Sequence, residues 1–175
     1  NRHLIWVADD VAPAGNGSFN SYRPNLSITF EDANAAYVSS TAIQASEDDV
    51  YKNSLNNEIV ALKVVTQGTL NPLSLTSVTF NTTGTTSTSD ISAARVYYSN
   101  DNVFSTAVQF GNQIDNPNGE ITFTGDKPLS SENFFWLVYD VKSSAGLDNT
   151  LDAQCTGFVV SDACLLYTSP SPRDS

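Results

Sequence analysis

Acidic side chains in turn-like segments are the first candidates for chemistry in this chain. Carboxylates stand side by side in Asp9-Asp10 and in Glu47-Asp48-Asp49. Calcium takes several oxygen ligands, and adjacent carboxylates on one loop can supply some of them. Glu47, Asp48 and Asp49 are therefore our candidate calcium ligands, and calcium is the one cofactor considered. Their spacing is not that of an EF-hand loop, and such charge runs in turns are usually solvated without a metal.

Nucleophilic catalysis needs an activating base, and the chain offers almost none. His3 is the sole histidine, and it lies outside the main domain defined below, where neither a Ser-His-Asp nor a Cys-His set can form. Zinc sites of the His/Cys type lack ligands, and no Gly-rich phosphate loop is present. Cys155 stands in a strand-like run and is expected to pack as a small core hydrophobe. We expect no catalytic residue in this chain.

Aromatic side chains could bind a sugar by stacking on its apolar face, which requires an exposed ring on a flat surface. Tyr97 and Tyr98 are adjacent in a strand-like run, so their rings point to opposite faces and one of them is expected to face outward. These two tyrosines are the candidate glycan platform. Trp136 lies in an apolar strand, where core packing is the favoured interpretation.

The charge of the chain limits its partners. The formal net charge is −11, with only eight Lys and Arg residues. Such a surface repels nucleic-acid phosphates and anionic membranes, so we expect neither as a partner. No apolar run approaches the length of a membrane span. Charged residues are only 15% of the chain, and abundant Thr, Val, Tyr and Phe favour strands.

Short strand-like runs alternate with Gly, Pro and Asn turns, and no segment is convincingly helical. Because each alternating strand leaves an apolar face that one sheet cannot hide, two sheets must pack together. The prediction is an all-β fold, a two-sheet antiparallel β-sandwich of Ig-like or jelly-roll-like kind. The expected strands are residues 36–46, 59–66, 73–81, 91–99, 104–110, 120–124, 133–141 and 151–160.

Two runs predict finer detail. In residues 73–81 the apolar parity slips between Leu75 and Val78, and one extra residue near Ser77, a β-bulge, would restore a common face. Residues 133–141 are apolar on both parities, which indicates a central strand covered on both sides.

The order of these runs predicts the domain organisation. Residues 1–30 read as the final hairpin of an upstream β-domain, residues 31–35 as a linker and residues 36–160 as the main sandwich domain. The chain begins with Asn1 rather than Met, so we expect a window on a longer protein. Residues 164–174 back-translate to the transposase adapter used for sequencing libraries. Residues 164–175 are therefore expected to be an adapter-derived artefact and disordered.

A set of segments in the main domain carries a family resemblance. They are Ile59-Val-Ala-Leu-Lys-Val-Val-Thr66, Asn71-Pro-Leu-Ser-Leu-Thr-Ser-Val-Thr-Phe-Asn-Thr-Thr-Gly84, Asp90-Ile-Ser-Ala-Ala-Arg-Val-Tyr-Tyr98, Phe123-Thr-Gly125, Phe134-Phe-Trp-Leu-Val-Tyr-Asp140 and Leu151-Asp-Ala-Gln-Cys155. In this order they resemble the N-terminal domain of BNR-repeat neuraminidases, also called the BNR assembly domain. The resemblance implies a β-sandwich in large secreted or cell-surface bacterial proteins, many of them type IX secretion cargo. Residues 2–30 resemble the closing strands of jelly-roll modules in similar proteins.

The catalytic parts of a sialidase are not found in this sequence. Such an enzyme needs an arginine cluster, a Tyr nucleophile with a Glu partner, and an Asp acid/base, and its propeller carries Asp boxes. No Asp box is present, and Arg2, Arg23 and Arg95 are the only arginines before residue 164.

Three functional hypotheses remain open. The first is a non-catalytic accessory or assembly module of a secreted multidomain bacterial protein, such as a sialidase-type hydrolase, whose partners are its neighbouring domains. An apolar patch near Val160 would favour it. The second is a carbohydrate-binding module that targets a hydrolase to glycans, favoured by an exposed aromatic pair. The third is an adhesin or stalk repeat, favoured by domain ends that lie at opposite poles.

Overall fold

A computed structural model of the 175-residue chain describes residues 32–161 and 163–165. The chain divides into two units, Asn1–Asp32 and Ala33–Ser175, and the second is described by itself. The expected upstream hairpin at residues 1–30 lies outside the described residues. The predicted domain boundaries stay predictions.

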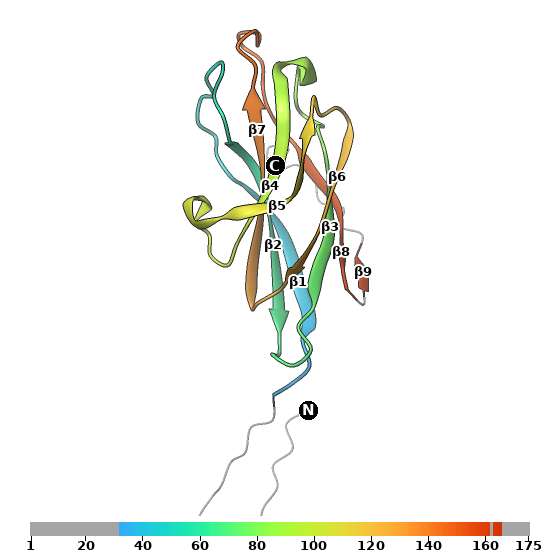
Figure 1. The fold of residues 1–175 in the computed structure, drawn as a ribbon. Helices are drawn as coiled ribbons and strands as arrows, with labels where there is room; N and C mark the ends of the chain where they lie inside the picture. Colours follow the sequence, from blue (N-terminus) through green and yellow to red (C-terminus); the bar gives the residue numbers. More distant parts are fainter. Residues whose placement is uncertain (1–31, 162, 166–175) are drawn as a thin grey trace, which may run out of the picture. The chain divides into compact units, whose positions relative to one another are not determined.

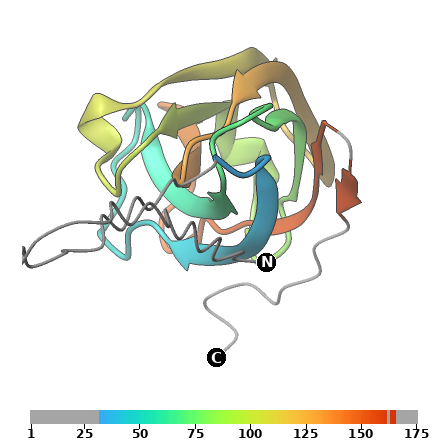
Figure 2. The same ribbon diagram turned by 90° about the horizontal axis from the view of Figure 1, so that it is seen from below.

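Two antiparallel sheets pack face to face, as Figure 1 shows from the side and Figure 2 from below. The first sheet contains, in spatial order, β1 (Ala36–Gln44), β2 (Asn57–Gln67), β7 (Glu132–Val141), β4 (Ile91–Ser99) and β5 (Val108–Asp115). The second contains β6 (Glu120–Pro128), β3 (Ser74–Asn81), β8 (Gln154–Val160) and β9 (Ala163–Leu165). Within the described residues the only helical elements are two single 3-10 turns, η1 (Thr88–Asp90) and η2 (Phe104–Thr106). The predicted all-β sandwich is confirmed.

The core lies between the sheets and is built by alternation along each strand. Every second residue of β2 and β7 faces the second sheet. Alternate residues of the strands in the second sheet pack against them. The large, fully buried side chains of the core include Leu62, Val64, Leu75, Val78, Phe80, Ile91, Phe123, Phe135, Leu137 and Tyr139. Burial of each such side chain contributes about 1.5–3 kcal/mol before the entropy cost of ordering it.

The expected bulge in β3 is present. Its pairing with both β6 and β8 shifts register between Leu75 and Ser77. Because Thr76 is an extra residue relative to β8, Leu75 and Val78 both face the core and are fully buried.

The strand with apolar residues on both parities is β7, and it lies in the middle of the five-stranded sheet, as predicted. Phe134 and Trp136 point to the outer face of this sheet, where they form a second apolar cluster with Ala61. The Trp136 indole donates a hydrogen bond from Nε1 to Ser99 Oγ over 2.8 Å. Core packing of Trp136 is therefore confirmed.

The segment between β4 and β5 differs from the expected strand at residues 104–110. Phe104 begins the 3-10 turn η2, and β5 starts only at Val108 and continues to Asp115. The turn places the Phe104 ring against Trp136 with a centroid separation of 6.1 Å. Phe104 thus covers the outer cluster instead of continuing a strand.

The residues before β1 and after β8 meet the chain where it passes from β2 to β3, at the turn of residues 68–73 and at Ser74, the first residue of β3. The amides of Thr69 and Leu70 donate to Ala33 O over 2.9 and 3.1 Å. Ser161 N donates to Ser74 O over 2.7 Å, and Ser74 N donates to Ser161 Oγ over 2.8 Å. The chain therefore enters β1 and leaves β8 at one end of the sandwich.

The backbone of β9 includes the first residues of the segment expected to be disordered. Cys164 pairs with Val159 and Leu165 with Phe158. For these two residues the expectation of disorder is wrong, because their backbone pairs with β8. Residues 166–175 lie outside the described part of the chain, and their origin as an adapter stays a prediction.

Candidate functional site

Four loops gather at the end of the sandwich opposite the β2–β3 turn, at the top of Figure 1. Because neighbouring strands are antiparallel, the connections β1–β2, β3–β4, β5–β6 and β7–β8 all lie at this end. We call it the apical end. Loops at one end of a rigid sandwich are a common place for binding sites.

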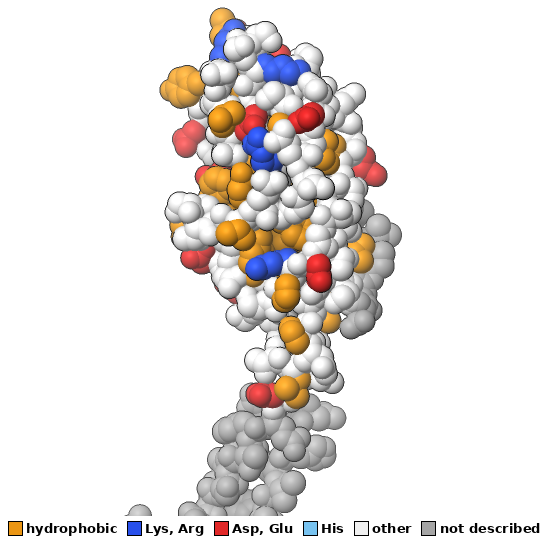
Figure 3. Space-filling view, viewed as in Figure 1, with side chains coloured by type: hydrophobic (Ala, Val, Ile, Leu, Met, Phe, Trp, Pro, Cys, Tyr) orange, Lys and Arg blue, Asp and Glu red, His pale blue; other side chains and the backbone are white. Residues whose placement is uncertain are grey.

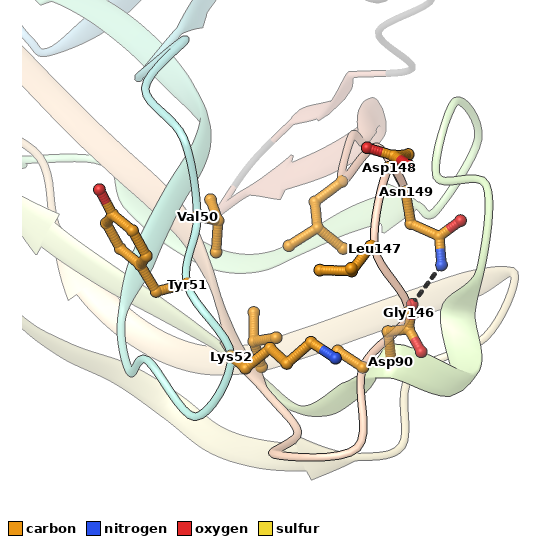
Figure 4. Close-up of a pocket in the computed structure, with 11 residues that line it drawn as sticks. Val50, Tyr51, Lys52, Asp90, Gly146, Leu147, Asp148 and Asn149 are labelled. Atoms are coloured by element: carbon orange, nitrogen blue, oxygen red, sulfur yellow. Dashed lines mark hydrogen bonds between the residues drawn. The ribbon is translucent and has the colours of Figure 1, made fainter.

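An apolar hollow of about 450 Å³ opens between the β1–β2 loop and the β7–β8 loop. Figure 4 shows Val50 and Leu147 bordering this space from the two loops, while Lys52 extends across it toward Asp90. The ring of Tyr51 points outward from the first loop. Val141, Ala145 and Leu151 complete the apolar lining.

Hydrogen bonds to the β3–β4 connection hold the β7–β8 loop in place. Asn149 Nδ2 donates to Asp90 Oδ2 over 2.6 Å, and Lys142 N donates to Asp90 O over 2.8 Å. Thr150 N donates to Thr86 Oγ1 over 2.7 Å. These bonds fix the backbone on both sides of Leu147 and leave its side chain at the surface.

A second hollow of about 550 Å³ adjoins the first and shares Val50, Asp148, Asn149 and Leu151 with it. Its charged lining is entirely acidic and consists of Glu47, Asp48, Asp49, Glu58 and Asp148. Burial raises the pKa of the Glu58 carboxyl. Because the two hollows share these four lining residues, we describe them together and call them the apical groove.

The predicted calcium ligands line this groove without forming a ligand cluster. Glu47, Asp48 and Asp49 are exposed in the β1–β2 loop. Across residues 32–161, no group of three or more His, Cys, Asp or Glu side chains is placed to hold a metal ion. The structure therefore adds no support to the calcium hypothesis, which stays a prediction.

The two tyrosines of the predicted glycan platform lie on opposite faces of β4. The Tyr98 ring is only 5% exposed and packs in the inter-sheet core at 5.2 Å from Phe135. Tyr97 is half-buried on the outer face, where Phe104 meets its ring edge to face at 5.4 Å. A buried ring cannot stack on a sugar, so Tyr97 and Tyr98 do not form a shared exposed platform.

Basic side chains do not gather anywhere in the described part of the chain. Figure 3 shows Lys and Arg scattered over the face in view. Lys63 pairs with Glu132 at 2.6 Å and Arg95 with Asp140 at 2.7 Å. Lys142 Nζ donates to Ser89 O, and Lys127 lies over the Tyr98 ring. No arginine cluster for a substrate carboxylate is present between residues 32 and 161.

Sequence reasoning missed the apolar part of the groove. Val50 and Lys52 stand about a hundred residues from Leu147 and Asn149, and only the pairing of β2 with β7 brings their loops together. The available signal was local: Tyr51, Leu55 and Leu147 are large apolar residues in segments otherwise rich in Asn, Asp, Ser and Gly.

Fold and site together define an all-β module with a loop-lined groove at one end. Residues 38–163 match the family model described as the N-terminal domain of BNR-repeat neuraminidase. The chain belongs to this family, as its sequence resemblance predicted. A comparison with curated proteins gave no match. No helix in the described ranges is long and apolar enough to cross a bilayer.

Proposed function

We propose that this chain is a non-catalytic accessory module of a larger secreted bacterial protein, in which it holds neighbouring domains in a defined position. Its family supports the accessory role. The observation that carries the proposal is the shared turn between β2 and β3. Ala33 before β1 and Ser161 after β8 both form backbone hydrogen bonds with residues 69–74.

This geometry favours the first of the three hypotheses. Modules of a linear stalk are entered at one pole and left at the other, whereas here both attachments lie at one end. The aromatic pair expected of a glycan-binding face is not formed, since Tyr98 is buried. An accessory role held at one end therefore fits best.

An apolar patch near Val160 would favour this role, and Val160 itself does not contribute to one. Val160 is fully buried, because it faces the core at the end of β8. The large hydrophobic side chain exposed on the shared turn is Leu70. A neighbouring domain that packs at this end would contact Leu70, which forms an isolated bridge with Asn34 of the incoming chain.

The test joins this chain to the domain that follows it in the parent gene and compares the thermal unfolding of that domain with and without the module. We expect the module to raise the Tm of its neighbour by several degrees, roughly 1–2 kcal/mol. Leu70→Asp should remove the gain, whereas Leu147→Asp at the apical end should keep it. An unchanged neighbour Tm in the joined chain would contradict the proposal.

A further inference from the structure

Exposed apolar side chains concentrate at the apical end. Of the large hydrophobic residues that are well exposed in the described ranges, four stand in apical loops: Val50 at 40%, Leu55 at 68%, Tyr51 at 75% and Leu147 at 77%. Val50 and Leu147 of this set border the apolar hollow, whereas Leu55 is outside its lining and the Tyr51 ring points outward. Because the chain enters and leaves at the other end, these loops are not needed to attach neighbouring domains.

The charge around this apolar surface is mostly negative. Glu47, Asp48, Asp49, Glu58 and Asp148 line the adjoining part of the groove, and none of them forms an ion pair with a described residue. Lys52 is the one basic residue that lines either hollow. Unpaired acids beside an apolar hollow attract a ligand that is both basic and apolar.

We infer that the apical groove is a docking site for a basic polypeptide segment of a partner protein that carries a large apolar side chain between its Lys or Arg residues. This inference rests on the proposed function, in which the opposite end attaches the neighbouring domains. The apolar side chain would enter the hollow between Val50 and Leu147. The flanking cationic groups would reach the carboxylates of the β1–β2 loop and Asp148.

The chemistry of the groove favours this occupant over the others. Nucleic acids and anionic lipids are repelled by the carboxylates. Sugar hydroxyls can donate hydrogen bonds to the carboxylates, but a neutral glycan brings no positive charge to balance them, and the Tyr51 ring points away from the hollow and cannot stack on a sugar bound there. A second copy of this chain carries the same strong negative charge. A cationic peptide gains from both parts of the groove, because its apolar anchor and its charges are both accommodated.

The experiment measures fluorescence anisotropy of a labelled Lys-Arg-Leu-Lys-Leu-Arg-Lys peptide with the whole chain. Two reference peptides replace either the leucines by serines or the basic residues by Glu and Asp. We expect the basic apolar peptide to bind at least about tenfold more tightly than either reference. Its affinity should fall as salt increases, since exposed charge pairs are screened.

Variants locate the binding. Leu147→Asp should weaken binding about tenfold, and the triple change Glu47→Gln, Asp48→Asn, Asp49→Asn should weaken it several-fold and flatten the salt dependence. The matched controls are Val108→Asp, an exposed apolar residue of β5, and the triple change Asp101→Asn, Asp126→Asn, Glu132→Gln at exposed positions away from the apical loops. Circular dichroism and Tm confirm that each variant is folded.

Three outcomes would overturn the inference. Equal binding of the reference peptides would show that the groove does not select a basic apolar segment. An equal loss in the control triple would indicate diffuse attraction only. Binding of a neutral oligosaccharide that depends on Leu147, with no peptide binding, would make the groove a glycan site. None of these outcomes affects the neighbour Tm test, in which Leu147→Asp is the silent control.

Discussion

At the scale of single residues, Asn133 is a buried polar group whose side chain connects several elements of the described fold. It is fully buried at the start of β7. Its Nδ2 donates to Val64 O over 3.1 Å and to Ser130 O over 2.7 Å. Its Oδ1 accepts from Ser130 N over 2.8 Å and from the Tyr98 hydroxyl over 3.1 Å. One amide thus joins β2, β4 and the β6–β7 turn.

Asn133→Ala should lower the free energy of unfolding by about 2–4 kcal/mol, because several buried donors and acceptors would lose their partner at once. Urea unfolding at neutral pH measures the change. Asn112→Ala, at an exposed position of β5, is the control and should stay within about 0.5 kcal/mol. A loss for Asn133→Ala no larger than that control would contradict this role.

The buried thiol of Cys155 makes the stability of the fold depend on pH. Burial raises the pKa of this thiol from 9.0 to about 12. Above pH 9.0 the folded state therefore keeps a proton that the unfolded chain releases. The contribution of the protonated thiol to the free energy of unfolding is fully present below pH 9.0 and is lost as the pH rises toward about 12. Burial, with the Asp152 charge, also raises the pKa of Tyr139 and acts in the same direction above pH 10.0.

We expect the free energy of unfolding to fall steeply above pH 9.0, by up to about 1.4 kcal/mol per pH unit for each such group. The measurement is the urea midpoint as a function of pH in a Cys164→Ser background. Adding Cys155→Ala should make the fall shallower between pH 9 and about 11. In the same background the native thiol should resist a thiol reagent until the protein unfolds. Fast labelling of native Cys155 would show that it is not buried.

At the scale of elements, β3 and the segment after β4 show what periodicity can predict. The bulge in β3 was predictable because Leu75 and Val78 break a period of two within one run that must face one core. The turn at Phe104 was not, because Phe104 and Phe110 have the same parity and read as one strand. In the structure Phe104 packs on the outer face near Trp136, whereas Phe110 packs inside, 5.4 Å from Phe135. When a turn interrupts a run, residues of the same parity can face opposite sides of the sheet, and parity alone does not reveal this.

The same limit applies to the candidate site. Glu47, Asp48 and Asp49 were recognisable because they are adjacent in the chain. Leu147 and Lys52 were not, because their proximity depends on strand pairing and loop hydrogen bonds rather than on any local pattern.

Phe104→Ala should expose the outer cluster. Removing the ring uncovers one edge of Trp136, so the indole emission should shift to longer wavelength and stability should fall by about 1–3 kcal/mol. The measurement uses a Trp6→Phe background, in which Trp136 is the sole indole. Val103→Ala, at a half-exposed position beside η2, should leave the emission unchanged. An unshifted spectrum for Phe104→Ala would mean that η2 does not cover Trp136.

At the scale of the whole domain, the arrangement of its two ends can be measured directly. Energy transfer between dyes at residues 35 and 161 should be high, since both positions adjoin the β2–β3 turn. Dyes at residues 35 and 148 should transfer less, because residue 148 lies at the apical end. Labelling needs the Cys164→Ser background, and the buried Cys155 should stay unlabelled. Equal transfer in the two labelled pairs would contradict the described topology.

Adjacent ends also make the sandwich portable. A module whose two attachments lie side by side can be spliced into a surface loop of a host protein, because the host needs only a small gap to accommodate it. Gene rearrangement can therefore move such a cassette between unrelated enzymes without rebuilding either fold. Its four remote loops can then diverge in sequence while the frame that presents them stays the same.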